Sequence, residues 1–489
     1  MHNEQPLKIL ILASEVVPFA KVGGLADVVG ALPKALQELG QDVRVVMPRY
    51  RQVDPERFAL TTILDALTVN IAGFQEQVNV RLGSIGNGIP VYMIDAPRFF
   101  DRENIYGYTD DGERFILFCR AALEAMRALD WSPDIIHCND WQTGIVPNWM
   151  HTVYHGDPFF ANTATVYTIH NLAYQGIFGY RILEVAGVAA GGFLYPQIVE
   201  LANVVDIMGR GILFADAITT VSGRYAQEIL TPEFGEKLDQ LLRSRRERLF
   251  GILNGIDYQE MNPAADRYIH TCYDSDTLDK RAENKRALQE RAHLPAKPEV
   301  PLLAMISRLT DQKGFDLIAQ IAQPLLAQGI QLVVLGIGDT HYHEMFQDLA
   351  ARYPEQVANF LTFNTELAQA IYAGSDMFLM PSRFEPCGLG QLIAMRYGSV
   401  PIVRSVGGLA DTVQEYDPRT GEGNGFAFSK YDPWEFFAAI VRALELFRIK
   451  GIWRTLQRRG MAADHSWRAS AIRYIEVYRN ALEFHRSGM

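Results

Sequence analysis

The chain has 489 residues, of which 48% are hydrophobic and 21% charged, so it is long enough for about two or three globular domains and is not disordered. Its formal net charge of −11 argues against binding to nucleic acid or to anionic membranes, so a phosphate site needs a few locally placed cations. No apolar run approaches the roughly 20 residues of a membrane span, and the start of the chain lacks the features of a signal peptide. The four cysteines show no paired spacing, which predicts free thiols in a cytoplasmic protein.

A glycine loop separates an apolar run from an amphipathic segment near the start of the chain. Residues 7–13 predict a buried parallel strand, and apolar residues at helical spacing follow the loop KVGGLAD at residues 21–27. Gly23 and Gly24 let the backbone approach a ligand, and Lys21 adds positive charge where a helix start already favours an anion. The loop therefore predicts a phosphate site, although a tight turn with a solvated lysine would use the same residues.

The first half of the chain alternates buried strands with helical segments, as a parallel doubly wound sheet requires. Residues 59–83 depart from this pattern and predict an antiparallel hairpin or meander inserted in the sheet. The expected strands are residues 7–13, 42–47, 91–95, 135–138, 165–169 and 217–221, with a helix at residues 112–129.

The second half restarts the same alternation of strands and helices. A turn near residues 253–257 follows a charged segment, residues 236–248, that we expect to be exposed. We therefore predict an α/β protein with two Rossmann-like domains, residues 1–252 and 253–465, and a C-terminal helix, residues 466–489, that packs back on the first domain. The expected strands of the second domain are residues 301–307, 331–336, 360–363, 377–381 and 400–404.

A short internal echo links the two halves. Residues 22–29 read VGGLADVV and residues 406–413 read VGGLADTV, each after a predicted strand and at the start of a predicted helix. The echo can reflect generic loop chemistry in two similar domains. It can also mean that each domain offers a glycine-lined helix start to one ligand, because ligands of open α/β sheets bind at the carboxyl ends of the strands.

Candidate binding groups in the second domain follow predicted strands. Arg308 and Lys313 lie in the loop SRLTDQKG and could clamp a diphosphate, although exposed loop cations are often only solvated. Glu385 lies in SRFEPCGLGQ, where it could accept hydrogen bonds from sugar hydroxyls or cap a helix. These loops favour a diphosphate and a sugar as neighbouring parts of one ligand.

Two loops of the first domain interleave polar and aromatic residues, as sugar recognition requires. They are HCNDWQ at residues 137–142 and TIHNLAYQG at residues 168–176. Singly, His137 or His170 would more often be a structural histidine.

An Asp274-Ser275-Asp276 motif could hold a metal under a diphosphate, but it precedes a helical pattern, so we expect a helix cap and no metal.

Six ordered motifs, spread over nearly the whole chain, resemble those of the bacterial and plant-type glycogen and starch synthases. They are KVGGLAD, HCNDWQ, TIHNLAYQG, NGID, SRLTDQKG and SRFEPCGLGQ. The resemblance implies a GT-B fold, with two Rossmann-like domains facing across a deep cleft. It also implies transfer of glucose from ADP-glucose to the non-reducing end of an α-1,4-glucan, with retention of configuration and without a cofactor, in the cytoplasm or in the plastid stroma of a plastid-bearing source.

The resemblance also assigns roles to positions in this sequence. Arg308 and Lys313 would stabilise the departing ADP, His170 would bind the transferring glucose, and Phe363 would lie against adenine. Tyr106 and Tyr108 are acceptor contacts in this interpretation. The implied catalytic residues are His170, Glu385, Arg308, Lys313 and Asp140, and the implied substrate-binding residues are Lys21, Gly23, Gly24, Asp27, Asn254, Phe363, Cys387, Gly388, Leu389, Gly390 and Tyr106.

Two positions depart from the family pattern. Gly390 stands where threonine is frequent, so a side-chain hydroxyl contact is absent, and Ile393 stands where related retaining transferases carry a second glutamate. The sequence therefore favours front-face substitution over a mechanism with two carboxylates. The alternatives are a glucan phosphorylase, which needs pyridoxal phosphate and a longer chain, and a weakly catalytic glucan-binding or initiation protein, which the intact cationic motifs argue against.

Overall fold

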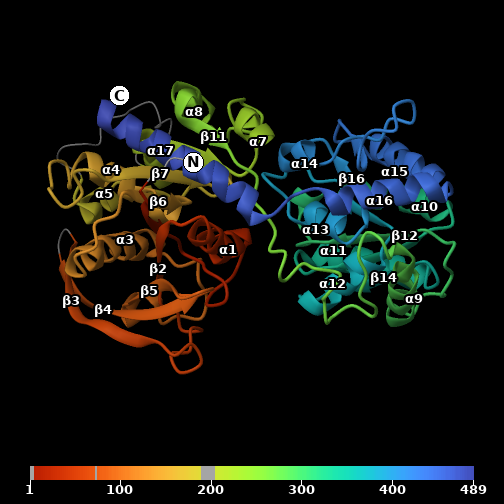
Figure 1. Cartoon of the computed structure of the whole chain (residues 1–489), viewed down its shortest axis with the longest axis horizontal. Helices are drawn as coiled ribbons and strands as arrows, with labels where there is room; N and C mark the ends of the chain where they lie inside the picture. Colours follow the sequence, from red (N-terminus) through yellow and green to blue (C-terminus); the bar gives the residue numbers. More distant parts are fainter. Residues whose placement is uncertain (1–4, 72–73, 189–203, 489) are drawn as a thin grey trace. The chain divides into compact units, whose positions relative to one another are not determined.

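The computed structural model describes residues 5–71, 74–188 and 204–488, and the chain forms two compact units (Figure 1). Unit 1 comprises Met1–Gly255 and Trp467–Met489, and unit 2 comprises Ile256–Ser466. Each unit has its own sheet and its own core. Within the described residues, no helix is long and apolar enough to cross a membrane.

Unit 1 is built on a mixed sheet whose order is β11-β10-β7-β6-β1-β2-β5-β4-β3. The strands from β11 to β5 are parallel, whereas β3 and β4 form an antiparallel hairpin added at the edge, which confirms the hairpin predicted for residues 59–83. A separate small antiparallel pair joins β8 (Ile177–Gly179) to β9 (Val204–Asp206). The main-sheet strands are β1 (Lys8–Leu12), β2 (Asp42–Pro48), β3 (Thr61–Ile71), β4 (Phe74–Ile85), β5 (Ile89–Asp95), β6 (Ile135–Asn139), β7 (Ala164–Ile169), β10 (Ala217–Thr220) and β11 (Leu249–Gly251).

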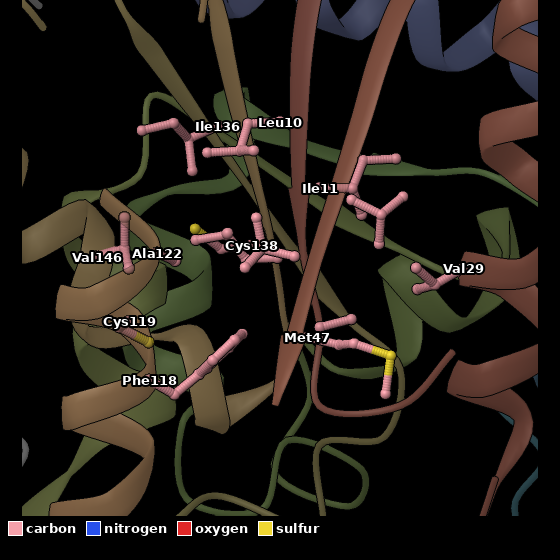
Figure 2. Close-up of a cluster of buried hydrophobic side chains, with 14 of the residues drawn as sticks. Leu10, Ile11, Val29, Met47, Phe118, Cys119, Ala122, Ile136, Cys138 and Val146 are labelled. Carbon is pink, nitrogen blue, oxygen red and sulfur yellow. The ribbon is translucent and has the colours of Figure 1, made fainter. Parts of the chain in front are cut away.

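Helices cover both faces of this sheet, so its central strands are buried on both sides. Figure 2 shows Val29 of α1 on one side of the strands, and Phe118 and Ala122 of α3 with Val146 of α4 on the other. Successive side chains of a strand point to opposite faces, which is why both neighbours in β1, Leu10 and Ile11, are buried. The helices of unit 1 are α1 (Gly24–Glu38), α2 (Pro97–Phe100), α3 (Asp111–Ala128), α4 (Ile145–His151), α5 (Arg181–Ala186), α6 (Ile207–Phe214), α7 (Gly223–Glu228), α8 (Asp239–Ser244) and α17 (Trp467–Ser487).

The C-terminal helix α17 completes unit 1. It packs against α1, β7 and β10, and Figure 1 shows this blue helix beside β7. Its buried Tyr478 forms a hydrogen bond with His137 Nδ1 (2.9 Å), and Ser470 Oγ donates to the Leu253 carbonyl (2.6 Å). The C-terminal helix therefore packs on, and helps to stabilise, the sheet formed by the first half of the chain.

The segment at residues 236–248 is more structured than its charge suggested. It contains α8, and both Leu238 and Leu242 are buried in the core of unit 1. The expectation of an exposed segment is wrong, because two leucines at helical spacing anchor one face, while Arg243 and Arg246, which follow them, are exposed.

Unit 2 contains an all-parallel sheet of order β14-β13-β12-β15-β16-β17. The predicted strand at residues 360–363 is displaced: β14 spans Val357–Phe360, and Phe363 lies in the following loop, 70% exposed. Its apolar character suggested a strand because sequence pattern does not distinguish a core aromatic from one that lines an open pocket. The other strands are β12 (Leu302–Ile306), β13 (Gln331–Leu335), β15 (Met377–Met380), β16 (Val400–Arg404) and β17 (Phe426–Phe428).

The helices of unit 2 pack on both faces of its sheet and form the remaining core clusters. The helical pattern predicted after Asp276, at residues 277–291, is a 3-10 turn (Leu278–Lys280) followed by α9. The helices are α9 (Arg281–Arg291), α10 (Phe315–Leu326), α11 (Thr340–Arg352), α12 (Thr365–Gly374), α13 (Gly390–Arg396), α14 (Gly407–Thr412), α15 (Pro433–Phe447) and α16 (Lys450–Ala462).

Candidate active-site residues

Three candidate loops of unit 1 follow strands that are neighbours in the sheet. Lys21 follows β1, Asp140 follows β6 and His170 follows β7, and these strands lie side by side in the order β7-β6-β1. Because the three strands are parallel, their carboxyl ends share one edge, and their loops emerge together there.

The glycine loop is organised by a buried carboxylate that the sequence did not bring to attention. Glu15 is 4% exposed, and its Oε2 accepts hydrogen bonds from the backbone N–H groups of Val22 (2.5 Å) and Gly23 (2.8 Å). Its Oε1 accepts from the Tyr106 hydroxyl (2.6 Å). Two loop N–H groups are therefore already bound, and an anion would meet the helix start only from Gly24 onward.

Lys21 and Asp27 form an ion pair at the start of α1. Lys21 Nζ lies 2.6 Å from Asp27 Oδ1, with side-chain exposures of 42% and 34%. An exposed pair of this kind contributes little stability, so a phosphate can take over the lysine at low cost. A Cβ placed on Gly23 or Gly24 meets no atom within 4 Å, so packing within the protein does not require glycine at either position.

The second copy of the echo behaves differently. A Cβ on Gly407 would lie 2.0 Å from the Glu385 carbonyl oxygen, and one on Gly408 would lie 2.0 Å from the Cys387 carbonyl oxygen. Gly408 N also donates to the Glu385 carbonyl (3.1 Å). These glycines serve close packing against the loop that carries Glu385, and only the first copy leaves its glycines next to open space.

Asp140 and His170 are connected through the backbone. Asp140 adopts φ 53°, a left-handed conformation that is uncommon outside glycine, and its Oδ1 accepts a hydrogen bond from His170 N (2.8 Å). Burial raises the pKa of Asp140 to about 7, and the hydrogen bond from His170 N opposes that shift. Burial also lowers the pKa of His170 to about 3, so its imidazole is neutral near pH 7.

His137 has the structural role that a lone histidine usually has. It is 1% exposed, its Nδ1 contacts the Tyr478 hydroxyl, and its Nε2 contacts Thr168 Oγ1 (2.6 Å). Burial lowers its pKa to about 3, with a further contribution from His170. His137 therefore joins β6 to α17 and leaves no ring nitrogen for a ligand.

In unit 2, Lys313 and Glu385 form a close ion pair. Lys313 ends a 3-10 turn (Asp311–Lys313) after β12, and Glu385 follows the adjacent strand β15. Lys313 Nζ lies 2.7 Å from Glu385 Oε2, and Ser382 Oγ donates to the same oxygen (2.9 Å). The side-chain exposures of the pair are 16% and 8%, so little water screens it.

A cavity of about 190 Å³ lies beside Arg308 at the carboxyl ends of β12, β13 and β14. Its lining includes Arg308, Gly336, Ile337 and Phe363. Arg308 is exposed, and its guanidinium forms no hydrogen bond or ion pair with any residue in the described ranges, so that group is available to a ligand.

The remaining predicted positions have these environments. Asn254 is buried after β11, and its Oδ1 has no hydrogen-bond partner among the residues described. Gln391 Nε2 donates to the Cys387 (3.2 Å) and Gly388 (3.0 Å) carbonyls and so shapes the loop that leads through Leu389 and Gly390 into α13.

Asp274 has a local structural role. Its Oδ1 accepts hydrogen bonds from Asp276 N (3.0 Å) and Thr277 N (2.9 Å) ahead of the 3-10 turn, as predicted for a polar loop and cap. Across the part of the chain that the structure describes, no cluster of three or more His, Cys, Asp or Glu residues could hold a metal ion.

Comparisons with known proteins agree with this geometry. Residues 8–244 match the starch synthase catalytic domain, and residues 287–448 match the glycosyl transferases group 1. The glycogen synthase of Moorella thermoacetica is 51% identical over 488 residues, covering 99% of both chains, and that of Desulforudis audaxviator is 48% identical, covering 98% of this chain and 97% of its own.

Solved structures give the same result. The catalytic domain of starch synthase IV from Arabidopsis thaliana, bound to ADP and acarbose, has a TM-score of 0.91 and 35% identity, covering 98% of this chain and 100% of that one. Sucrose-phosphate synthase from Thermosynechococcus elongatus, at 18% identity and a TM-score of 0.60, shares the fold. The two units and their strand-end loops define a glycosyltransferase of the GT-B class. Within that class, the chain belongs to the family of glycogen and starch synthases.

Proposed function

We propose that this enzyme transfers glucose from ADP-glucose to the non-reducing end of an α-1,4-glucan with retention of configuration, without a metal or other cofactor. The observation that carries the proposal is the cavity beside Arg308, where an exposed aromatic ring and an unengaged guanidinium lie together. The Arabidopsis starch synthase was solved with ADP and acarbose, a nucleotide and an oligosaccharide analogue, which supports both ligand classes.

We assign the nucleotide-sugar donor to the second domain, residues 253–465. A flat purine fits a cavity walled by Phe363 and Ile337, because its faces need apolar contact and its edges need few polar partners. Arg308 borders the same cavity, where its planar fork can bind a diphosphate oxygen pair. Lys313 follows in the same loop and adds a point charge.

The first domain, residues 1–252 with the C-terminal helix 466–489, is assigned to catalysis and the acceptor. His170 is neutral, so its imidazole can form a hydrogen bond with a glucose hydroxyl. Asp140 fixes the backbone of the loop that carries His170. Lys21 can leave Asp27 for a donor phosphate. Tyr106 supports this site indirectly, because its hydroxyl is bound to Glu15 under the glycine loop.

The reaction that fits these residues is front-face substitution. The bond between glucose C1 and the phosphate oxygen breaks, the acceptor hydroxyl oxygen bonds to C1 on the same face, and its proton passes to the leaving phosphate. Ile393 offers no carboxylate for a covalent intermediate. Lys313 and Arg308 therefore contribute mainly by stabilising negative charge that grows on the diphosphate.

A donor-comparison assay tests the proposal. Purified enzyme in EDTA, supplied with glycogen and either ADP-glucose or UDP-glucose, should form α-linked product with ADP-glucose as the better donor. An absolute requirement for a divalent ion, a β-linked product, or absorbance from bound pyridoxal phosphate would contradict it.

We also place the reaction in the cytoplasm, a prediction supported by four cysteines that are all free thiols.

A further inference from the structure

We propose that Asn139 is a positioning residue that fixes the tautomer of His170, so that His170 Nδ1 presents a hydrogen-bond acceptor to a hydroxyl of the bound sugar. The sugar's place beside His170 rests on the proposed function. The tautomer itself rests on hydrogen bonds within unit 1.

The orientation of the Asn139 amide is set by backbone carbonyls. Asn139 is 1% exposed at the end of β6, and its Nδ2 donates to the Leu12 carbonyl (3.0 Å) and, more weakly, to the His137 carbonyl (3.5 Å). A flipped amide would place Oδ1 against these oxygens, which cannot donate. The amide oxygen therefore points away from β1 and toward His170.

This orientation decides which ring nitrogen of His170 carries the proton. His170 Nε2 lies 2.9 Å from Asn139 Oδ1, and an amide oxygen can only accept, so Nε2 must be the donor. In a neutral imidazole, Nδ1 is then a bare acceptor. No residue in the described part of the chain forms a hydrogen bond with Nδ1, and His170 as a residue is only partly buried, so Nδ1 is open to a ligand.

The titratable neighbours of His170 are consistent with a neutral ring. Asp140 faces its backbone N–H and not its imidazole. His137 lies on β6 with both ring nitrogens bound, and burial keeps its pKa low. Since no described carboxylate forms an ion pair with the His170 imidazole, a second proton on the ring has no partner there.

The chemical consequence concerns sugar recognition. A hydroxyl that donates to Nδ1 keeps its own oxygen free to accept elsewhere, whereas a protonated Nδ1 would compete with the hydroxyl proton. Asn139 thus acts through His170 and does not need to touch the substrate.

Nitrogen NMR of the wild-type enzyme tests the tautomer directly. The protein is labelled with ¹⁵N-histidine, and the His170 signal among the 11 histidines is identified by its loss in His170→Gln. We expect a protonated Nε2 and an unprotonated Nδ1 throughout about pH 6 to 8. A proton on Nδ1, or a doubly protonated ring, would overturn the proposal whatever the activity.

The Asn139→Asp variant tests the consequence for turnover. A carboxylate beside Nε2–H favours the doubly protonated ring, which has no acceptor at Nδ1, so the acid limb of the kcat profile should move to higher pH while activity recovers in alkaline buffer. A purely structural defect would lower kcat by the same factor at every pH, and that result would count against the proposal. Asn148→Asp, another fully buried asparagine on α4, controls for burying a carboxylate.

The two proposals fail in different ways. An enzyme that shows the Nε2–H tautomer but does not use ADP-glucose would remove the proposed function and leave the tautomer assignment in place. An enzyme that uses ADP-glucose with a proton on Nδ1 would remove the role of Asn139 alone.

Discussion

Lys313 Nζ and Glu385 Oε2 lie 2.7 Å apart at the ends of two adjacent parallel strands, and both side chains are mostly shielded from water. The two charges are paired with each other, and Glu385 Oε2 also accepts a hydrogen bond from Ser382 Oγ. A departing diphosphate would bring a second negative charge to Lys313, whereas Glu385 would turn its remaining acceptor capacity to sugar hydroxyls. Under the proposed function, the pair would couple donor binding to glucose binding within unit 2.

The first prediction concerns the cations. Arg308→Ala and Lys313→Ala should each lower kcat by ~10²-fold or more, because aimed positive charge stabilises the departing diphosphate more than the bound donor. The donor KM should change less than kcat. Steady-state kinetics at saturating glycogen measures both quantities.

Lys430→Ala is the matched control, since Lys430 is 83% exposed and belongs to a surface ion pair. The diphosphate assignment is wrong if kcat stays within about threefold of wild type for both Arg308→Ala and Lys313→Ala.

The second prediction concerns the stability of the ion pair. Glu385→Ala leaves a largely buried ammonium without its carboxylate, so the free energy of unfolding should fall by roughly 3 kcal/mol. The double variant Glu385→Ala with Lys313→Met should recover part of that loss, because no unpaired charge remains. Urea unfolding, followed through the transition that belongs to unit 2, measures the free energy of unfolding of both variants. An equal loss of this free energy in the single and the double variant would argue against an unpaired charge as the cause.

The third prediction separates the two copies of the glycine echo. Gly408→Ala should destabilise the protein by about 1–3 kcal/mol, because its Cβ would collide with the Cys387 backbone. Gly23→Ala should change stability by less than about 0.5 kcal/mol and lower activity instead, because no protein atom lies within 4 Å of its Cβ, whereas the proposed donor phosphate would approach it. Thermal unfolding and kinetics on both variants test the contrast, which disappears if both glycines affect stability alike.

The fourth prediction is a pH dependence from Asp140. Its folded pKa of about 7 lies above the ordinary value of an unfolded aspartate, so the folded state binds the proton more tightly. Its contribution to stability is therefore complete below about pH 4 and is lost as pH rises to about 7, by roughly 2–4 kcal/mol. Asp140→Asn should flatten this part of the stability profile.

Chemical denaturation at several pH values compares the two proteins. Subtracting the variant from the wild type removes the contribution of Asp206, whose pKa burial also raises to about 7. Parallel profiles for the two proteins would show that Asp140 is not the titrating group.

Local pattern predicted much of the fold because buried parallel strands are short apolar runs with punctuated ends. Such runs gave β1, β2, β6 and β12 within a residue or two of their observed bounds. Local pattern did not predict β11 and β17, because each has only three residues, too few to show an alternation of apolar and polar residues. Their existence depends on pairing with a neighbour strand that is distant in sequence.

The candidate site residues show the same division between what local pattern predicts and what only tertiary contacts reveal. Lys21, His170, Arg308 and Glu385 stand in motifs at strand ends, and the structure places each at the predicted edge of its sheet. Glu15 was not predicted, although an acidic residue two positions after the apolar run ILILA at residues 9–13 is a signal that could have found it. The role of Asn139 depends on the Leu12 carbonyl, and that contact exists only once β6 pairs with β1.

The way α17 completes unit 1 has a consequence for the order of synthesis. Tyr478 meets His137 across 341 positions of sequence, so the face of the sheet that α17 covers stays uncovered until all of unit 2 has been synthesised. At about 5–20 residues per second, translation of Ile256–Ser466 alone takes roughly ten to forty seconds. Unit 2 can therefore fold before unit 1 has its complete core, although synthesis of unit 1 begins first.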